Sequence, residues 1–299
     1  MYFVIRNSPR GFSKMKKLFF VITVICLAMQ FCLVQAEEAF EYKQTLVKGP
    51  IIMLSGAGGN IAVLKGEQGV LLVDDGFDKN SAPLKASLSA LGEAPQYLLN
   101  THWHGDHTGA NATLGDVTIV AHDNVRLRLI KGSERAEPAP AAALPDITYN
   151  DGMTIHFGGQ TVSLMHFPKS HTDGDSVIFF EPAHVVHMGD LMFAGSFPFV
   201  DTSSGGSVAG YIKSLAAIIE KLDDDSVVIP GHGQITNLAG VKAFQAMIVE
   251  TSATISKMKA AGKTNEQAQT AGLGSKWKGW GDFFIDEERW INTLWAGVE

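Results

Sequence analysis

The chain has 299 residues, with 24 lysines and arginines against 31 aspartates and glutamates and a net charge of −7 when histidines are neutral. Nucleic-acid binding depends largely on basic side chains at phosphates, so this acidic balance argues against a nucleic-acid partner. Hydrophobic residues make up 45% of the chain, and a chain of this length can bury a sizeable core.

The first 36 residues have the composition of an export signal. Three lysines precede an uncharged apolar run over residues 18–33, and Val34-Gln35-Ala36 ends in the small residue that signal peptidases prefer. We expect cleavage after Ala36, a periplasmic or secreted protein, and no stable membrane insertion afterwards. An uncleaved membrane anchor is the alternative, and Met15 is an alternative start of translation.

Removal of residues 1–36 would change the charge and the chemistry of the chain. It would leave 263 residues with 19 of the 24 basic side chains and all 31 acidic ones, a net charge of −12. Both cysteines, Cys26 and Cys32, lie inside the apolar run. The mature chain would therefore form no disulfide, and its strong metal ligands would be histidines and carboxylates.

Short apolar segments separated by glycines follow from Pro50 and predict an antiparallel meander. Its strands are expected over residues 51–54, 61–64 and 70–73. The glycine-rich residues 56–60 are expected to form a tight hairpin near the mouth of a site, because no Gly-Lys-Ser/Thr element follows to make a phosphate loop.

Helices and strands then alternate. Helices are expected over residues 81–91 and 122–130, strands over 96–99 and 117–120, and a long loop rich in proline and alanine over 132–145. A second meander over 153–157 and 161–167 precedes strands at 177–180 and 184–187, a helix at 212–222, a strand at 227–229 and a helix at 238–258. These two runs suggest two related halves packed sheet against sheet, with helices outside.

We expect one domain over residues 37–299 with a helical tail at its C-terminal end. The tail from Trp277 to Trp295 holds four of the five tryptophans. The favoured interpretation is a terminal helix whose Ile291, Leu294 and Trp295 pack on the body. A substrate lid or a dimer contact is the alternative.

The densest group of metal-ligand side chains follows an apolar strand and reads Thr-His-Trp-His-Gly-Asp-His over residues 101–107. In an extended segment alternate side chains point the same way, so His102 and His104 can grip one ion. The glycine that follows allows a sharp turn, which can aim Asp106 and His107 at a second ion. One segment therefore predicts ligands for two metals.

Further candidate ligands stand just past apolar runs and beside glycines or polar turns. They are His171, Asp190 and His232. The remaining histidines lie on expected strands or helix starts, and we expect them to be surface or hydrogen-bonded core residues: His122, His156, His166, His184 and His187. Of these, His122 opens an expected helix and His187 lies near Asp190, so a role at the site stays open for both. Asp175 can be a turn residue or a partner of a ligand, and Asp173 is interpreted as a turn residue.

These motifs, in this order, resemble those of the metallo-β-lactamase superfamily over residues 45–240. The resemblance implies an α/β fold, specifically a four-layer αββα sandwich. It implies a first metal held by His102, His104 and His171, a second metal held by Asp106, His107 and His232, Asp190 bridging both, and Asp74 orienting the ligand loop. An aspartate rather than a cysteine at position 190 is similar to the branch that contains glyoxalase-II-like hydrolases.

Imidazoles and carboxylates together suit zinc best, with two ions per chain, although iron or manganese occupies similar sites in related enzymes. Two such ions would activate a water molecule to attack a carbonyl, with Asp106 orienting it and passing on its proton. This predicts an exported dinuclear zinc hydrolase that acts on a small-molecule ester, thioester, lactone or β-lactam amide. The alternatives are a mononuclear-iron sulfur dioxygenase of the same fold and a non-catalytic metal-binding protein. The loop over 193–207 either walls the substrate pocket or only links a strand to a helix.

Overall fold

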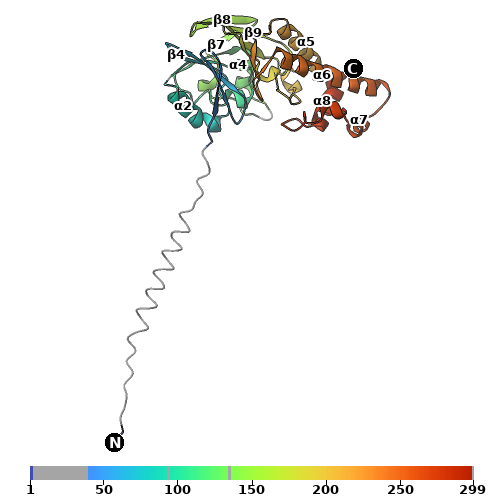
Figure 1. Cartoon of the computed structure of the whole chain (residues 1–299), viewed down its shortest axis with the longest axis horizontal. Coiled ribbons are helices and arrows are strands. Elements are labelled where there is room, and N and C mark those ends of the chain that lie inside the picture. Colours follow the sequence, from blue (N-terminus) through green and yellow to red (C-terminus); the bar gives the residue numbers. More distant parts are fainter. Residues whose placement is uncertain (3–39, 93, 134–135, 298–299) are drawn as a thin grey trace. The chain divides into compact units, whose positions relative to one another are not determined.

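The structure is a computed structural model that describes residues 1–2, 40–92, 94–133 and 136–297. Apart from its first two residues, the expected signal segment lies outside the described residues. Glu41–Glu299 forms one compact unit, and its strands and helices are shown in Figure 1. Within the described part of the chain, no helix combines the length and the apolar character that crossing a bilayer requires.

The first sheet contains seven strands that lie side by side in chain order. They are β1 (Lys43–Lys48), β2 (Ile51–Ser55), β3 (Ile61–Gly66), β4 (Gly69–Val73), β5 (Pro95–Leu99), β6 (Thr118–His122) and β7 (Ile147–Tyr149). Strands β1 to β4 pair antiparallel, which confirms the predicted meander, and β4 to β7 pair parallel. The parallel half places the carboxyl ends of β4, β5 and β6 at one edge.

The second sheet contains six strands in the order β13-β12-β11-β10-β9-β8. They are β8 (Gly152–Phe157), β9 (Gln160–His166), β10 (Ser176–Glu181), β11 (Val185–His187), β12 (Val227–Ile229) and β13 (Thr236–Asn237). Only the β11–β12 pair is parallel. Each sheet therefore begins with an antiparallel meander, as expected from the sequence, and parallel pairing follows it at β4 to β7 in the first sheet and at β11–β12 in the second.

The two sheets pack face to face, and strand β10 shows how the sequence sets this. Its residues are buried on both sides of the sheet, which requires an uninterrupted apolar run rather than alternation. Ile178 and Phe180 point into a core shared with Leu64 and Leu71 of the first sheet. The alternate residue Phe179 points the other way, into a core built with helices.

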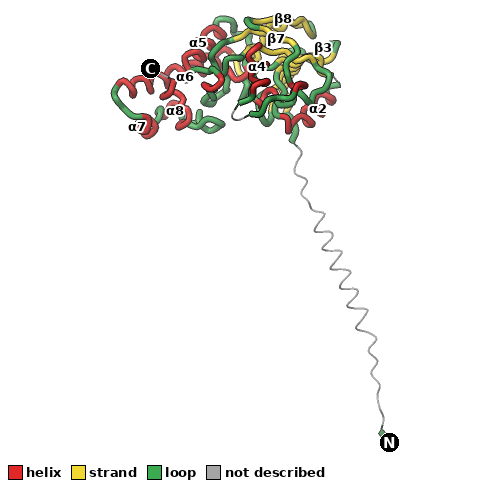
Figure 2. Tube along the Cα trace, turned by 180° about the vertical axis from the view of Figure 1, so that it is seen from behind, coloured by secondary structure: helices red, strands yellow, loops and turns green. Residues whose placement is uncertain are grey.

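Helices cover the outer faces of both sheets, as Figure 2 shows for the red segments around the yellow strands. The helices of the described residues are α2 (Ser81–Ala90), α3 (Gly105–Thr108), α4 (Asp123–Lys131), α5 (Val208–Ile219), α6 (Leu238–Ala260), α7 (Asn265–Ala271) and α8 (Glu287–Gly297). Of these, α3 is a single turn after β5, and α7 packs on α8. Val125 and Leu129 of α4 pack against β6, whereas α5, α6 and α8 bury their apolar faces against the second sheet. The predicted four-layer αββα sandwich is confirmed.

The C-terminal helix α8 packs on the body of the molecule. Trp290, Ile291 and Leu294 are all buried in the core that α5 and α6 share, while Trp295 is only partly buried. The expected packing of Ile291 and Leu294 is therefore confirmed. The segment between Trp277 and α8 has a different role, because it reaches the candidate site.

Candidate metal centre

The seven candidate ligands converge from both sheets onto one edge of the sandwich. His102 and His104 follow the carboxyl end of β5, and Asp106 and His107 lie in the single turn of α3. His171 lies between β9 and β10, Asp190 follows β11, and His232 follows β12. Together these side chains form two groups that could each hold a metal ion: His102, His104, His171 and Asp190, and then Asp106, His107 and His232.

In the first group three imidazoles point their nitrogens at a common centre. His104 Nδ1 lies 3.1 Å from His102 Nε2 and 2.9 Å from His171 Nε2. The rings meet edge to face, with interplanar angles of 85° to 89°. Imidazoles that bind one ion must point one nitrogen each at the same place, and these three rings do so.

In the second group two imidazoles and a carboxylate converge in the same way. His107 Nε2 lies 3.4 Å from His232 Nε2. Asp106 Oδ2 lies 3.5 Å from the first of these nitrogens and 3.3 Å from the second. These three residues come from α3 and from the loop after β12, so the second group forms only when the two sheets are packed.

Asp190 lies between the groups and turns one oxygen to each. Its Oδ2 lies 3.4 Å from His171 Nε2 and 3.8 Å from His102 Nε2. Its Oδ1 lies 3.1 Å from His107 Nε2 and 3.3 Å from His232 Nε2. The Asp190 carboxylate is thus placed to bridge two cations, and its backbone oxygen accepts a hydrogen bond from Tyr211 Oη.

The outer nitrogens of four histidines are already used as donors, which leaves the inner nitrogens as lone pairs. His171 Nδ1 donates to Phe199 O at 2.7 Å, and His104 Nε2 donates to Asp201 Oδ2 at 2.9 Å. His107 Nδ1 donates to Asp74 Oδ2 at 2.7 Å, and His102 Nδ1 lies 3.1 Å from Thr101 Oγ1. Such partners fix the ring orientation and tautomer of metal-ligating histidines.

The facing lone pairs require a positive charge between them. The inner nitrogen of His104 lies 3.1 Å from that of His102 and 2.9 Å from that of His171, and lone pairs this close repel each other unless a cation lies among them. Asp190 Oδ1 is buried and accepts no hydrogen bond of ordinary geometry from any described residue. A buried carboxylate oxygen without a donor is costly, and coordination removes that cost. The two groups of ligands therefore fit divalent metal ions such as zinc.

The pKa values of His102 and His171 are lowered in the first group and that of His232 is raised in the second, as expected for neutral ligands beside a site that favours positive charge. Burial lowers the pKa of His171 to about 4 and lowers that of His102 as well, so both are neutral ligands at pH 7. Burial opposes ionisation of His232, but Asp190 and Asp106 outweigh it and raise its pKa to about 9. The carboxylates of Asp190 and Asp106 therefore favour a positive charge at the second group.

Asp74 is the central support of the ligand loop, as the resemblance implied. The residue is completely buried at the end of β4, with φ of 60°. Its Oδ1 accepts from Thr101 N and its Oδ2 accepts from Thr101 Oγ1, both at 2.8 Å, in addition to His107 Nδ1. The Asp74 carboxylate therefore orients the second group directly, through His107, and the first group through Thr101, which contacts His102.

Two glycines permit the close packing of backbone against ligands. A Cβ at Gly59, in the turn between β2 and β3, would lie 2.3 Å from the His107 ring. A Cβ at Gly231 would lie 2.2 Å from Asp190 Oδ1. The predicted hairpin at residues 56–60 does lie against the site, and glycine is required at position 59 by this contact rather than by the turn.

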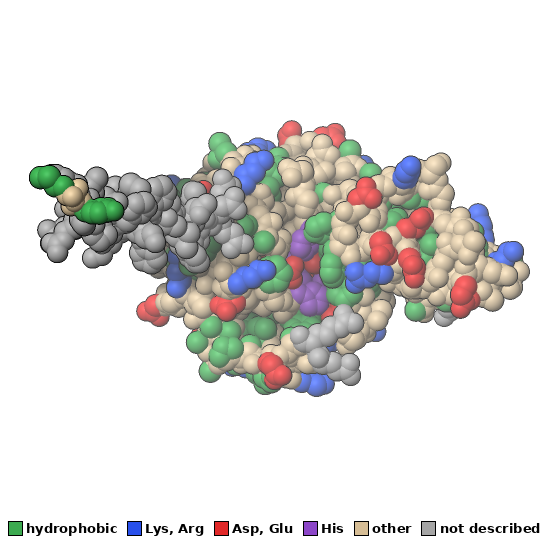
Figure 3. Space-filling model, turned by 90° about the horizontal axis from the view of Figure 1, so that it is seen from below, with side chains coloured by type: hydrophobic (Ala, Val, Ile, Leu, Met, Phe, Trp, Pro, Cys, Tyr) green, Lys and Arg blue, Asp and Glu red, His purple; other side chains and the backbone are tan. Residues whose placement is uncertain are grey.

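The site opens to solvent on one side. His104, Asp106 and His232 expose 16%, 23% and 11% of their side chains, while the other four ligands are buried. Figure 3 shows histidine and acidic side chains together in a hollow on one face, with hydrophobic side chains on its rim. A substrate approaching this face would therefore meet Asp106 and His232 of the second group and His104 of the first.

The loop over residues 193–207 contributes to the site in a way that the sequence left open. Phe199 O and Asp201 Oδ2 hold His171 and His104, as described above. The His104 bond and two serine donors hold the pKa of Asp201 well below its usual range, against the effect of burial. Neither residue was predicted as a partner, because an acid in a glycine- and serine-rich stretch also fits a simple turn.

The other histidines lie outside both groups, as expected. His187 Nε2 donates to Asn60 O at 3.0 Å and its Nδ1 accepts from Gly189 N, so it supports the backbone beside Asp190. His122 stacks on His166 with ring centres 3.7 Å apart. Asp173 is more than the predicted turn residue, because Arg128 pairs with both of its oxygens at 2.6 Å.

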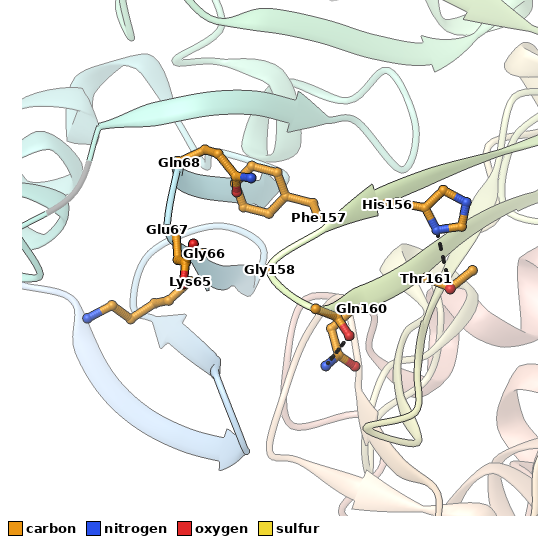
Figure 4. A pocket seen from close by; sticks show the side chains of 10 residues that line it. Lys65, Gly66, Glu67, Gln68, His156, Phe157, Gly158, Gln160 and Thr161 are labelled. Carbon is orange, nitrogen blue, oxygen red and sulfur yellow. Dashed lines mark hydrogen bonds between the residues drawn. The ribbon is translucent and has the colours of Figure 1, made fainter.

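A second cleft lies between the turn joining β3 to β4 and the turn joining β8 to β9, shown in Figure 4. These turns are at the opposite ends of their strands from the metal groups. Its lining includes one histidine, His156, and one acid, Glu67. It therefore offers no comparable set of ligands.

Comparisons with known proteins agree with this geometry. The family model of the metallo-beta-lactamase superfamily matches residues 54–232. The chain is 29% identical over 154 residues to the hydroxyacylglutathione hydrolase GloC of Haemophilus influenzae, covering 48% of this chain and 72% of that protein. It is 24% identical over 209 residues to the human acyl-coenzyme A thioesterase MBLAC2, covering 60% and 74%.

Among solved structures, the DIM-1 metallo-beta-lactamase superposes with a TM-score of 0.59 at 20% identity, covering 70% of this chain and 97% of that one. That likeness concerns the fold. The family match includes strands β3 to β12 and all seven candidate ligands. The chain therefore belongs to the metallo-beta-lactamase superfamily of metal-dependent hydrolases.

Proposed function

We propose that the chain is a dinuclear zinc hydrolase that cleaves esters and thioesters of small-molecule substrates. The observation that carries this proposal is the placement of Asp190, whose two oxygens face two separate sets of imidazoles. A carboxylate in that position would serve two ions at once. Nitrogen and oxygen donors without sulfur suit zinc.

His102, His104 and His171 would hold the first ion, Asp106, His107 and His232 the second, and Asp190 both. Zinc in such a site supplies a Lewis acid that polarises a carbonyl and lowers the pKa of water towards 7. The chain keeps both groups rigid through Asp74, Asp201 and Phe199, which fix the outer ring nitrogens. Preorganisation of this kind contributes to catalysis because little reorganisation remains during the reaction.

Asp106 is the proposed catalytic residue. It is the most exposed of the seven side chains, at 23%, so its carboxylate reaches the surface from which substrate enters. Burial opposes its ionisation, but His107 and His232 outweigh this effect and lower its pKa. Asp106 is therefore ionised at pH 7 and can accept the proton of the attacking water. It would then pass this proton to the departing sulfur or oxygen.

Thioesters are the preferred class within this proposal. Two relatives bear names that describe hydrolysis of an acyl group carried by a thiol, hydroxyacylglutathione and acyl-coenzyme A. A thiolate is a good leaving group, so a site whose general acid is only Asp106 is sufficient for it. Lactones and β-lactams remain within reach of the same chemistry and serve as competing substrates in the test.

Metal analysis and a substrate panel test the proposal. Protein matured during export should contain about two zinc ions per chain, and a thioester should be hydrolysed faster than a lactone or a chromogenic cephalosporin. One iron per chain, with oxygen consumption on glutathione persulfide, would replace the proposal by a sulfur dioxygenase. Hydrolysis of the cephalosporin alone would replace thioesters by β-lactams.

We also propose that the mature enzyme acts outside the cytoplasm. The support is the sequence of residues 1–36, with its lysines, its apolar run and its small-residue ending. N-terminal sequencing of protein recovered from the periplasm should begin at Glu37. Recovery of the full-length precursor in the membrane fraction would instead indicate an uncleaved anchor.

A further inference from the structure

Two phenylalanines of the C-terminal segment project beside the candidate metal centre. Phe283 and Phe284 expose 56% and 54% of their surfaces. The Phe283 ring centre lies 5.7 Å from that of His232, and the Phe284 ring centre lies 5.9 Å from that of Phe199. Adjacent exposed aromatic side chains at the edge of a reaction site indicate a binding surface rather than a chance exposure.

Phe199 extends this surface to the first metal group. Its ring centre lies 5.8 Å from the rings of both His104 and His171. The three phenylalanines therefore run along the site, with Phe283 beside the second group, Phe199 beside the first, and Phe284 against Phe199. We call Phe199, Phe283 and Phe284 the aromatic wall.

The aromatic wall is held in place by the core. Phe197 N donates to Trp280 O at 2.8 Å, and the Trp280 ring stacks on Phe244 of α6. On the other side of the phenylalanine pair, Ile285 is only 3% exposed. These two anchors hold the backbone on both sides of the phenylalanine pair.

Arg289 fixes the outer end of the wall. Its guanidinium donates to Phe284 O at 2.6 Å and lies 4.8 Å from the centre of the Phe284 ring. Stacking of this kind orients the ring and covers one of its faces. The Phe284 ring also meets the Phe199 ring edge to face, at an interplanar angle of 84°.

We propose that the aromatic wall binds an apolar acyl group, and that the substrates are thioesters or esters of acids with an extended hydrocarbon chain. This inference rests on the proposed function. The rings of Phe199 and Phe283 lie about 6 Å, centre to centre, from the ligand imidazoles, so a hydrocarbon chain that extends from a carbonyl at the metal groups passes along the aromatic wall. In the reaction the bond from the carbonyl carbon to sulfur breaks and a bond to water oxygen forms. The thiol takes one proton of the water, the acid leaves as a carboxylate, and the second proton is released to solvent.

A series of acyl thioesters with one constant thiol tests the proposal on the zinc-loaded enzyme. From acetyl to octanoyl, kcat/KM should rise about two- to fourfold for each methylene that reaches the rings. The double variant Phe283→Ala, Phe284→Ala should lose about tenfold on the octanoyl thioester and less than twofold on the acetyl one. The double substitution to leucine should retain most of the preference, because an apolar surface remains.

Leu127→Ala is the matched control. Leu127 lies on α4 with 61% of its surface exposed, away from the metal groups, so its removal should leave the chain-length preference unchanged. Equal kcat/KM for all chain lengths in the wild-type enzyme, or an unchanged preference in the double alanine variant, would overturn the proposal.

Product binding separates this inference from the proposed function. Calorimetric titration of the zinc-loaded protein should give octanoate a higher affinity than acetate, and the double alanine variant should remove about tenfold of the octanoate affinity only. If no ester or thioester is hydrolysed, the proposed function fails, while octanoate binding still decides whether the wall takes an apolar chain. Equal affinities for octanoate in the wild type and the variant would refute the wall.

Discussion

The molecule holds two clusters of histidines, and their comparison shows what makes one of them a metal centre. In the candidate metal centre the rings of His102, His104 and His171 meet edge to face, so that their nitrogens point at one place. In the other cluster His122 and His166 stack with ring centres 3.7 Å apart and an interplanar angle of 16°. Short distances between histidines occur in both, so distance alone does not identify a metal site.

The partners of the ring nitrogens account for the difference. His122 Nδ1 accepts from Asn124 N, which caps α4, and His166 Nδ1 lies 2.9 Å from Asp175 O. These contacts use the nitrogens to support local backbone. In the metal centre the outer nitrogens are anchored and the inner ones face carboxylates, above all Asp190. A carboxylate at the focus of several lone pairs is therefore the distinguishing feature.

Removal of the bridging charge should have the largest effect. Asp190→Asn keeps the shape of the side chain but removes its negative charge and replaces one of its two oxygens by an NH2 group, so we expect zinc content to fall from about two ions per chain to one or fewer. We expect kcat/KM to fall by about a thousandfold or more. Metal analysis after dialysis and steady-state kinetics measure the two effects.

Asp223→Asn is the control for Asp190→Asn. Asp223 pairs with His184 Nδ1 at 3.0 Å, and 54% of its side chain is exposed, so it forms a histidine–aspartate pair without converging ligands. Both readouts should stay at wild-type levels in this variant. Two zinc ions and near-normal kcat/KM in Asp190→Asn would show that the two groups do not depend on a bridge.

Asp106→Asn should have the next largest effect, and mainly on turnover. The amide cannot accept the proton of the attacking water, so kcat should fall about a hundred- to ten-thousandfold. The three histidines of the first group keep their partners, so at least one zinc ion should remain bound. Circular dichroism and metal analysis confirm that the fold and this ion persist, and unchanged kcat would remove Asp106 from the mechanism.

The ligands were predictable from the sequence because their arrangement is local. His102 and His104 are two residues apart after a buried strand, and Gly105 separates them from Asp106 and His107. The spacing alone therefore predicts that the two pairs of side chains point at two different ions. His171, Asp190 and His232 each follow an apolar run, and strands that end at one sheet edge bring such residues together. The structure places all seven within two adjoining groups.

The second partners and the aromatic wall were not predictable in the same way. Asp201 and Phe199 lie in a loop without periodicity, and Phe283 is 51 residues beyond His232 along the chain. Their positions depend on how loops pack, which no repeat in the sequence records. Local polar contacts also shifted one boundary, because the Ser207 hydroxyl accepts from Gly210 N and starts α5 at Val208 rather than at 212.

Asp201→Asn should weaken metal binding by a smaller factor than the changes at the ligands. The charge that stabilises the His104 tautomer is lost, while the amide oxygen still accepts the bond from Nε2. We expect zinc affinity to fall about tenfold in competition with a chelator, at the low end of the range for such partners. Asp146→Asn is the control, because Asp146 also accepts a backbone hydrogen bond, from Ile119 N, but touches no ligand.

The stacked pair should affect stability and its pH dependence, and leave metal binding unchanged. Burial, and then the charge of His166, lower the pKa of His122 to about 4. Between pH 6.5 and 4 the unfolded chain takes up a proton at this residue and the folded chain does not, so the stability that neutral His122 contributes is lost as the pH falls. His122→Asn, which keeps a cap acceptor for α4, should therefore flatten this decline by about 1 to 2 kcal/mol in urea unfolding of the zinc-loaded protein.

His184→Asn is the control. It lies in an exposed pair outside the stack, so the decline should stay as steep as in the wild type. An equally steep decline in His122→Asn would mean that the stack already carries a charge when folded, and zinc content equal to that of the wild type in both variants would keep the two histidine clusters functionally separate.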